Sequence, residues 1–417
     1  MIKESINKTC IIVGASHAGV NCAFALRRNG WQGKIKLYDA DPELPYHRPP
    51  LSKAYITASE NADVDLLFPK QNYETEKISL NLGVKVTSID KVLKTITLED
   101  ESKVQYDKLV LATGAKPFIP PIKGIENALD LYPMRNFTDA IHIKNALNAS
   151  VEKNVVIIGG GYIGLETAAS SRKMGANVTV LERESRVLER VTAPEMSAFF
   201  TELHQKNGVK ILTNKNVVKF EADATKNIIL CEDGTSYSAD LIVVGVGIKV
   251  NTDLAQNIGL ELENGIKVDQ NSRTSDTNIY AIGDCTYHFN PHYKRFLRLE
   301  SVQNAVDQAK IAASSICGND LIYDAIPWFW SDQYNVKLQM VGLSQGYNQI
   351  IKRVETDREN CKSIWYFKDD ELLAVDAVNN AKAYMLGSKI IKNNTKIDKV
   401  KLQDNTIKMT PRSFLFL

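Results

Sequence analysis

The sequence predicts an α/β protein with two doubly wound domains and a smaller C-terminal α+β domain. Two glycine turns, each between a buried strand and a helix, lie about 145 residues apart, at 14–19 and 159–164. From about residue 326, apolar and polar residues alternate around acidic and Gly/Asn turns, as in an antiparallel sheet with a helix packed on it. A chain of 417 residues is long enough for roughly two to four domains.

The first turn reads GASHAG, from Gly14 to Gly19. It follows a predicted strand at 10–14 and opens a helix that ends near residue 29. Ser16 replaces the middle glycine of the G-x-G-x-x-G pattern and is small enough to allow fairly close approach of a phosphate. Asp39 ends the next strand, twenty residues beyond Gly19, where it can hold a ribose. An ordinary glycine turn in an α/β sheet is the alternative.

After the first unit, the sequence predicts a loop, a strand that ends in a glycine turn, a domain crossing, a helix and a strand that ends on an acid. Residues 42–53, PELPYHRPPLSK, predict a loop, because proline lacks a backbone donor and has a fixed φ. Residues 106–114 predict a strand that ends in a turn at Thr113 and Gly114. The proline-rich stretch that follows predicts a domain crossing. Thr138 is the predicted cap of a helix, and a strand at 279–284 ends on Asp284.

The second turn is stronger evidence for a dinucleotide site, because the strand before it, the helix after it and the acid beyond them are all present. A β-branched strand at 155–158 leads into Gly159-x-Gly161-x-x-Gly164, with a helix predicted over 164–175 and a strand over 178–181. The first glycine permits the tight turn, the second lets a pyrophosphate approach, and the third lets helix and strand pack closely. Backbone amides at the helix start face the phosphates. Glu182, eighteen residues past Gly164, can accept both ribose hydroxyls.

Composition excludes several classes of protein. A net charge of +2 gives no field that attracts nucleic acid or an acidic membrane. The six cysteines form no C-x-x-C pair and no zinc-binding pattern, which predicts reduced structural thiols and no metal site. An uncharged apolar run of 18 residues is absent, and so is an apolar run before the first strand. We therefore expect a cytoplasmic protein that is not a membrane protein.

Longer stretches resemble the FAD-dependent pyridine-nucleotide oxidoreductases of glutathione-reductase type, and within them the ferredoxin reductases that serve oxygenases. These stretches, which span nearly the whole chain, are RPPLSKAY (48–55), ATGAKP (112–117), GGGYIGLE (159–166), RVLERVTAP (186–194), AIGDC (281–285), ESVQNAVDQAK (300–310) and IPWFWSDQY (326–334). The resemblance implies two Rossmann-like domains. It divides the chain into a split FAD domain (1–116 and 249–325), an NAD domain (117–248) and a C-terminal domain (326–417).

The resemblance also implies which residues hold FAD. Lys53 would reach the isoalloxazine, Asp284 the ribityl chain or the pyrophosphate, and the amide of Val302 the pyrimidine edge. Asp39, Ala40 or Asp41 would make the ribose contact. The full set of FAD-binding residues implied is Gly14, Ser16, Ala18, Gly19, Asp39, Arg48, Lys53, Val86, Thr113, Gly114, Arg135, Gly283, Asp284 and Val302.

On the nicotinamide side, the resemblance implies that Glu166 pairs with Lys53 and contacts the carboxamide. The alternative for Glu166 is a solvated helix residue. The carboxylate of Glu182 would repel a 2′-phosphate and favours NADH, although Arg183 beside it is of the type that accommodates NADPH. The NAD-binding residues implied are Gly159, Gly161, Tyr162, Ile163, Gly164, Glu166, Glu182 and Gly247.

The resemblance makes Lys53, Glu166 and Trp330 the catalytic residues. Flavin accepts electrons in pairs and passes them on singly, so the implied partner is a two-iron two-sulfur ferredoxin, and indirectly an oxygenase. Trp330 would lie beside the exposed flavin edge where ferredoxin docks. Of Trp328 and Trp330, at i and i+2, we expect one on a core face and one at an interface; core packing is the alternative for Trp330. A basic patch that receives an acidic ferredoxin has these candidates: Lys294, Arg295, Arg298, Lys337, Lys352 and Arg353.

Other functions remain as alternatives. A rubredoxin reductase shares the fold and differs in its acceptor. A flavoprotein like apoptosis-inducing factor binds NADH as a switch. A disulfide reductase needs a dithiol near the flavin, and residues 42–53 contain no cysteine. We expect a monomer or weak dimer.

Overall fold

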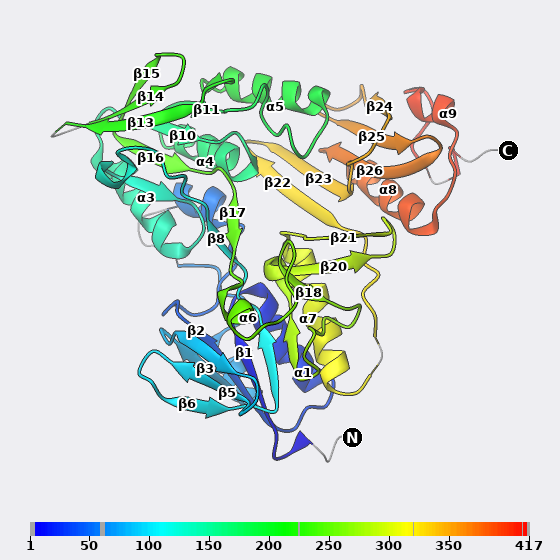
Figure 1. The fold of residues 1–417 in the computed structure, drawn as a ribbon. Coiled ribbons are helices and arrows are strands. Elements are labelled where there is room, and N and C mark those ends of the chain that lie inside the picture. Colours follow the sequence, from blue (N-terminus) through cyan, green and yellow to red (C-terminus); the bar gives the residue numbers. More distant parts are fainter. Residues whose placement is uncertain (1–4, 59–62, 224–225, 320, 411, 415–417) are drawn as a thin grey trace. The chain divides into compact units, whose positions relative to one another are not determined.

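The computed structural model describes residues 5–58, 63–223, 226–319, 321–410 and 412–414. Contacts between residues divide the chain into two compact units. Unit 1 comprises the described residues of 1–47, 64–116 and 249–327, and unit 2 those of 48–63, 117–248 and 328–417. The predicted fold class, two doubly wound domains and a C-terminal α+β domain, is confirmed (Figure 1).

Unit 1 is built on a five-stranded parallel sheet. In spatial order its strands are β19 (Ile279–Ala281), β7 (Lys108–Leu111), β1 (Thr9–Val13), β2 (Lys34–Asp39) and β3 (Ile78–Leu82). Strand β1 is apolar along most of its length because it is covered on both faces. On one face, helix α1 (His17–Arg28) contacts α7 (Val302–Ile316).

Two small sheets and short helices complete unit 1. An antiparallel sheet packs on the face of the parallel sheet opposite α1 and consists of β4 (Val86–Asp90), β5 (Thr95–Leu98) and β6 (Lys103–Gln105). The remaining elements are β18 (Ile266–Val268), β20 (Thr286–Asn290), β21 (Arg295–Leu297), α2 (Lys70–Thr75), α6 (Asp253–Asn257) and the 3₁₀ turn η4 (Gly283–Cys285).

Unit 2 contains a second five-stranded parallel sheet. Its strands, in order, are β12 (Lys210–Leu212), β11 (Asn177–Leu181), β10 (Asn154–Ile158), β16 (Leu241–Val244) and β9 (Leu131–Pro133). Around it lie the antiparallel strands β13 (Val217–Ala222), β14 (Asn227–Cys231) and β15 (Ser236–Ala239), and the helices α3 (Phe137–Ala149), α4 (Tyr162–Lys173), α5 (Pro194–Lys206), η2 (Leu51–Tyr55) and η3 (Ile125–Asn127). Strands β8 (Ala115–Pro117) and β17 (Ile248–Val250) pair where the chain passes between units.

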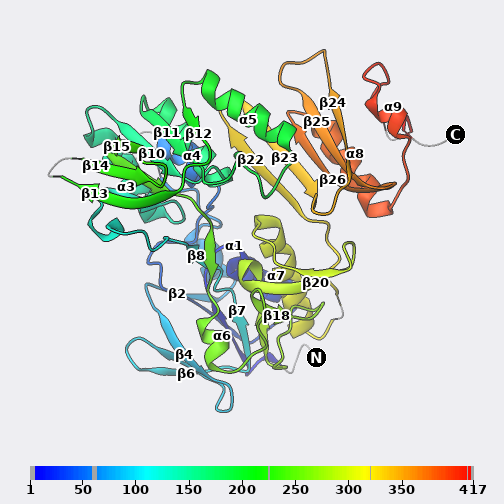
Figure 2. The same cartoon turned by 45° about the horizontal axis from the view of Figure 1, so that its top comes forward.

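The C-terminal part of unit 2 is an antiparallel sheet, as the alternating sequence predicts. Its order is β22 (Trp328–Gln333), β23 (Val336–Gly342), β26 (Glu371–Val378), β25 (Lys362–Lys368) and β24 (Gln349–Val354), followed by α8 (Ala381–Asn393) and α9 (Lys399–Gln403). Helix α8 contacts β26 and β23 (Figure 2). The face against α8 carries Trp328, Val341, Val375 and Trp365, which lie opposite one another across the strands.

Three expectations from the sequence differ from the structure. Thr138 is not the cap of its helix, because α3 begins at Phe137 and is capped by Asn136. Residues 51–55 are not a loop but a short helical turn, broken at Lys53, which has φ −123° and ψ −105°. The segment 48–63, which the sequence analysis assigned to the FAD domain, groups with unit 2, because Ser52 and Lys53 bond to Glu166 on α4. The three-domain boundaries as such stay a prediction.

None of the helices in the described ranges has the length and hydropathy needed to cross a bilayer.

The capping box of α3 gives a direct test of helix stability. Asn136 accepts the amide of Asp139 at 2.8 Å, and the Asp139 carboxylate accepts the amide of Asn136 at 3.0 Å. We predict that Asn136→Ala lowers the free energy of unfolding by about 1 kcal/mol, because amides in the first turn lose their acceptor. Thermal unfolding followed by circular dichroism measures the change. Thr138→Ala is the control, and an equal loss in both variants would contradict the assignment of the cap.

Candidate functional site

The second turn, residues 159–164, joins β10 to α4 and depends on two glycines for its shape. Gly159 has φ +104°, and a Cβ there would lie 2.5 Å from the carbonyl oxygen of Gly245. A Cβ on Gly164 would lie 2.1 Å from the carbonyl oxygen of Gly159. Both distances are far below van der Waals contact, so these glycines are required by the fold itself. The sequence likewise predicts a tight turn at Gly159 and close packing at Gly164.

Gly161 is different, because nothing in the described protein requires it to be glycine. A Cβ there would meet no atom within 4 Å, and its φ of −79° and ψ of −179° suit any residue. It is the N-cap of α4, yet no side chain caps the helix. The first-turn amides of α4 and its dipole therefore favour a negatively charged group beside open backbone. These properties fit a pyrophosphate.

Glu182 is held directly against the second turn. Its carboxylate accepts the amide of Gly160 at 2.6 Å and the amide of Glu184 at 2.8 Å, one on each oxygen. Each oxygen keeps further acceptor capacity, so the fixed carboxylate is available to hydroxyl donors. The sequence analysis missed Gly160, where a Cβ would lie 2.8 Å from Cγ1 of Val187.

The first turn, residues 14–19, repeats this construction in unit 1. A Cβ on Gly14 (φ +106°) would lie 2.2 Å from the carbonyl oxygen of Ala112, and one on Gly19 would lie 1.8 Å from that of Gly14. Ser16 is the N-cap of α1 but makes no capping hydrogen bond, so the amides of this helix also lack a side-chain acceptor.

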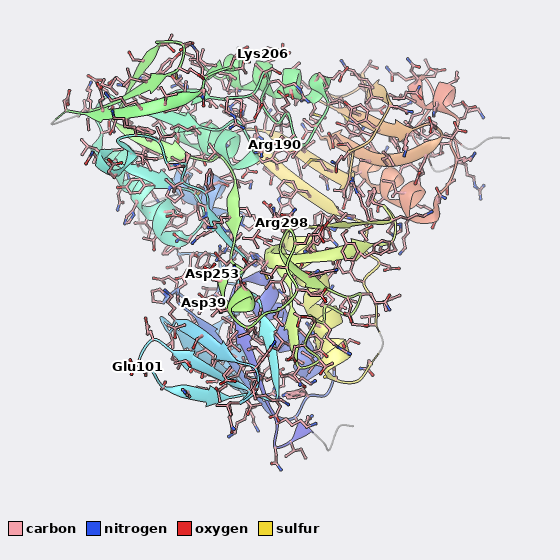
Figure 3. All side chains as sticks on the ribbon, in the orientation of Figure 1. Asp39, Glu101, Arg190, Lys206, Asp253 and Arg298 are labelled. Carbon is pink, nitrogen blue, oxygen red and sulfur yellow. The ribbon has the colours of Figure 1, made fainter. Side chains whose placement is uncertain are left out.

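Asp39, labelled in Figure 3, is the last residue of β2, and Glu182 directly follows the last residue of β11. The Asp39 carboxylate accepts the amide of Ala15 at 2.5 Å and the amide of Asp41 at 2.9 Å. Asp41 instead accepts the hydroxyl of Tyr46 at 3.0 Å. Of the three residues considered for the ribose contact, Asp39 is therefore the one bonded to the turn.

Other predicted FAD-binding residues lie at the carboxyl ends of the unit 1 strands, as the first turn does. Gly283 lies against Ala18, since a Cβ on Gly283 would approach the Cβ of Ala18 to 3.1 Å. Asp284 follows it in η4, and Val302 opens α7. Thr113 donates its hydroxyl to the carbonyl of Asn251 at 2.8 Å, and the amide of Asn251 donates to Gly114 at 3.0 Å.

Val86, by contrast, belongs to the core on one face of that sheet. Its predicted backbone contact with adenine is not tested by this placement. Asn251 and Gln308 were missed by the sequence analysis. The side-chain oxygen of Gln308 accepts the amide of Gly283 at 2.7 Å, so it fixes the turn that carries Asp284. Gln308 lies among other polar residues of α7, so its place in the sequence gave no separate signal.

In unit 2, Lys53 and Glu166 form the ion pair that the resemblance implied. Nζ of Lys53 lies 2.7 Å from Oε2 of Glu166, whose side chain is 1% exposed, against 18% for Lys53. Glu166 is therefore not a solvated helix residue. Two hydroxyls that the sequence analysis missed also donate to this carboxylate, Ser52 to Oε2 and Ser331 to Oε1, each at 2.6 Å. Both serines lie in stretches that carried the family resemblance.

The remaining predicted residues of unit 2 differ in their surroundings. The hydroxyl of Tyr162 donates to Sδ of Met340 at 2.8 Å, and burial raises the pKa of Tyr162 well above its usual value. Ile163 is exposed, and Gly247 has φ +118° with open space where a Cβ would lie. Arg48 and Arg135 also belong to unit 2, and their predicted flavin contacts stay predictions.

The tryptophan pair differs from the expectation. Trp328 and Trp330 lie on the same face of β22, with ring centroids 5.5 Å apart, because side chains at i and i+2 on a strand share a face. Neither ring is buried, so Trp330 is not a core residue. The face of β22 that turns to Glu166 carries Phe329 and Ser331.

Arg353 must be removed from the candidate basic patch. It is buried, pairs with Glu355 at 2.7 Å, and donates to the carbonyls of Leu402, Asp404 and Ile407. Lys337 and Lys352 are exposed. Arg298 pairs with Glu300 at 2.6 Å, which offsets its charge.

No disulfide joins the cysteines in the described residues. All six, which fall within the described residues, are free thiols, and five of them are buried. Burial raises the pKa of Cys285, the cysteine that follows Asp284, and so keeps it protonated. Within the described ranges, the structure contains no cluster of three or more His, Cys, Asp or Glu residues able to hold a metal ion.

Comparison with known proteins identifies two family matches. Residues 8–309 match the pyridine nucleotide-disulphide oxidoreductase family, and residues 328–411 match the reductase C-terminal family. The chain is 40% identical over 406 residues to the putidaredoxin reductase of Pseudomonas putida, covering 96% of each protein. It is 37% identical over 370 residues to a rubredoxin–NAD(+) reductase of Pseudomonas putida, covering 88% of this chain and 95% of that one.

A solved structure is similar in fold over nearly the whole chain. It is the covalent complex of putidaredoxin reductase with putidaredoxin, which matches with a TM-score of 0.92 at 40% identity. The match covers 97% of this chain and 97% of the matched chain.

The two kinds of glycine in the second turn give a matched pair of variants. We predict that Gly161→Ala folds normally but weakens binding of a nicotinamide dinucleotide roughly ten-fold or more, because its Cβ would project into the open space where we expect the pyrophosphate. Gly164→Ala should destabilise the fold, because its Cβ would collide with the backbone of Gly159. Thermal unfolding and titration with NAD⁺ separate the two effects. Equal loss of stability in both variants would refute the distinction.

Proposed function

Because the chain belongs to the pyridine nucleotide-disulphide oxidoreductase family, we propose that it is an NADH-dependent, FAD-containing ferredoxin reductase. The family and the relatives imply an oxidoreductase that uses a flavin and a pyridine nucleotide. The observation that supports two dinucleotides is the repeated cradle: each glycine turn opens a helix without a side-chain cap and has a carboxylate bonded to its own backbone.

In this proposal, each cradle holds one dinucleotide. The amides of the first turn bind the pyrophosphate of FAD, and Asp39 holds its ribose. Gly161 and the start of α4 bind the pyrophosphate of NADH, and Glu182 accepts its ribose hydroxyls. Glu182 disfavours NADPH, because its carboxylate would repel the negatively charged 2′-phosphate of that cofactor.

Glu166 and Lys53 orient the reacting ring. With three donors on its carboxylate, Glu166 is fixed in position, and such preorganisation is what an orienting residue requires. We propose that Glu166 contacts the carboxamide of nicotinamide and that Lys53 reaches the flavin. The flavin, when bound, supplies the conversion of one electron pair into two single electrons.

The proposed acceptor is a two-iron two-sulfur ferredoxin that feeds a monooxygenase or a ring-hydroxylating dioxygenase. The similarity to putidaredoxin reductase, alone and in its covalent complex with putidaredoxin, supports a ferredoxin. Trp330, half-exposed beside Trp328, is the proposed contact, and Lys337 and Lys352 remain candidates for an acidic partner. The similarity to a rubredoxin–NAD(+) reductase keeps rubredoxin as the alternative acceptor. We propose a cytoplasmic monomer or weak dimer.

One experiment tests the whole proposal. Purified protein should carry FAD, lose its flavin absorbance on anaerobic addition of NADH, and reduce cytochrome c rapidly only after a two-iron two-sulfur ferredoxin is added. Rapid transfer to rubredoxin but not to ferredoxin would favour the alternative acceptor. Protein that binds no flavin on reconstitution would refute the proposal.

The choice between NADH and NADPH is expected to depend on Glu182. We predict that Glu182→Gln raises the KM for NADH roughly ten-fold and narrows the preference over NADPH, because an amide is a weaker acceptor and no longer repels phosphate. Flavin content should stay constant. Glu184→Gln is the control, since the Glu184 side chain pairs with exposed Arg183. Unchanged preference in Glu182→Gln would exclude its ribose role.

The docking role of Trp330 is tested by comparing two electron acceptors. We predict that Trp330→Ala slows ferredoxin reduction roughly five-fold or more and leaves ferricyanide reduction unchanged, because a small acceptor needs no docking surface. Steady-state rates with each acceptor measure this. Trp328→Ala is the comparison, because it shows whether removing any ring from this face of β22 slows ferredoxin reduction to the same extent. If Trp330→Ala lowers the rates with ferredoxin and with ferricyanide equally, the defect lies in flavin or NADH binding and not in docking.

A further inference from the structure

The segment between β11 and α5, residues 183–193, lies directly against the second turn. The amide of Leu188 donates to the carbonyl of Gly160 at 3.0 Å, and the Val187 side chain fills the space beside Gly160. Gly160 is thus bonded on both sides, since its own amide donates to Glu182 at 2.6 Å. The position of this segment therefore sets the orientation of the Gly160 peptide and of the Glu182 carboxylate.

The far end of this segment is held by the C-terminal sheet. The hydroxyls of Thr192 and Tyr366 both donate to Oδ2 of Asp376, each at 2.5 Å. The amide of Ala193 donates to the Tyr366 hydroxyl at 3.1 Å. Tyr366 lies on β25 and Asp376 on β26, so two of these bonds join the segment to the middle of the sheet, and the third joins the two strands.

Burying a carboxylate at this junction costs free energy that a purely structural contact would not require. Asp376 is 4% exposed, and burial raises its pKa to about 6. A buried carboxylate between two hydroxyls stabilises a fold less than apolar residues of the same size. What the hydrogen bonds provide is a defined position, because short bonds to one oxygen allow one arrangement of the segment.

The same face of the sheet contacts the dinucleotide helix as well. Phe329, Met340 and Asp376 lie opposite one another on β22, β23 and β26. The ring of Tyr162, the residue after Gly161, lies 5.2 Å from that of Phe329. Ser331 on this face donates to Glu166. The C-terminal sheet thus touches α4 at its first turn and the segment that supports Gly160.

We propose that Asp376, together with Thr192 and Tyr366, is a positioning residue for the nicotinamide dinucleotide. It anchors residues 187–193 against Gly160, and through the Gly160 peptide it holds the Glu182 carboxylate toward the ribose. This inference rests on the proposed use of the second turn for NADH. It gives the C-terminal domain a part in NADH binding that is separate from any contact with the electron acceptor.

The test uses the full-length flavoprotein and two isosteric changes. Thr192→Val removes one hydroxyl and keeps the volume, and Tyr366→Phe removes the other and also the acceptor for Ala193. We predict that each raises the KM for NADH roughly five- to ten-fold and leaves kcat with ferricyanide at saturating NADH within about two-fold. Thr192→Ser keeps the hydroxyl and should restore the wild-type KM.

A buried hydroxyl on the opposite face of the same sheet serves as the control. Ser363 accepts Nε1 of Trp365 at 2.9 Å, so Ser363→Ala loses one buried hydrogen bond without touching the segment. Its KM should equal that of the wild type even if its unfolding temperature falls. If Thr192→Val does not fold, Tyr366→Phe alone decides the question.

Two failures are distinguishable. If the wild-type protein neither binds NADH nor is reduced by it, the proposed function is wrong. If the wild type uses NADH and both Thr192→Val and Tyr366→Phe have its KM, the positioning role of Asp376 is overturned. A rise in KM that Ser363→Ala reproduces would also overturn it, because general loosening of the sheet would then explain the effect.

Discussion

The buried carboxylate of Glu166 is the interaction on which the arrangement of unit 2 depends. An ionised carboxylate away from water is stable only with donors around it. Its three donors come from two separated parts of the chain: η2, which contributes Ser52 and Lys53, and strand β22, which contributes Ser331. The requirement to satisfy one charge therefore brings the proline-rich segment and the C-terminal sheet to helix α4.

A second constraint is the close approach of backbone to backbone in the glycine turns. In both turns the first and last glycines lie so near a carbonyl oxygen that any side chain would collide with it. In both, the acid at the end of the following strand accepts an amide from the turn. The middle position of the second turn, Gly161, is free of this constraint, and the first turn has Ser16 at the matching position.

The C-terminal sheet divides its two faces between two tasks. Alternation along β22 sends Phe329 and Ser331 toward α4 and leaves Trp328 and Trp330 on the face that carries α8. One strand thus connects the surroundings of Glu166 with the tryptophan pair proposed to meet the electron acceptor. The two proposed contacts, with the nucleotide and with the acceptor, therefore fall on opposite faces of one sheet.

The sequence by itself determined the two strand–turn–helix units, the acids that follow them, and the antiparallel C-terminal sheet. These features are local: glycine spacing, β-branched runs and alternation act within about thirty residues. It also identified the Lys53–Glu166 pair, but only through the family resemblance. Ser52, Ser331, Gln308 and the Thr192–Tyr366–Asp376 junction were decided by the tertiary structure alone. Such partners meet from positions far apart in the chain, and a buried charge or amide selects whichever donor the packing brings to it, so no spacing in the sequence announces them.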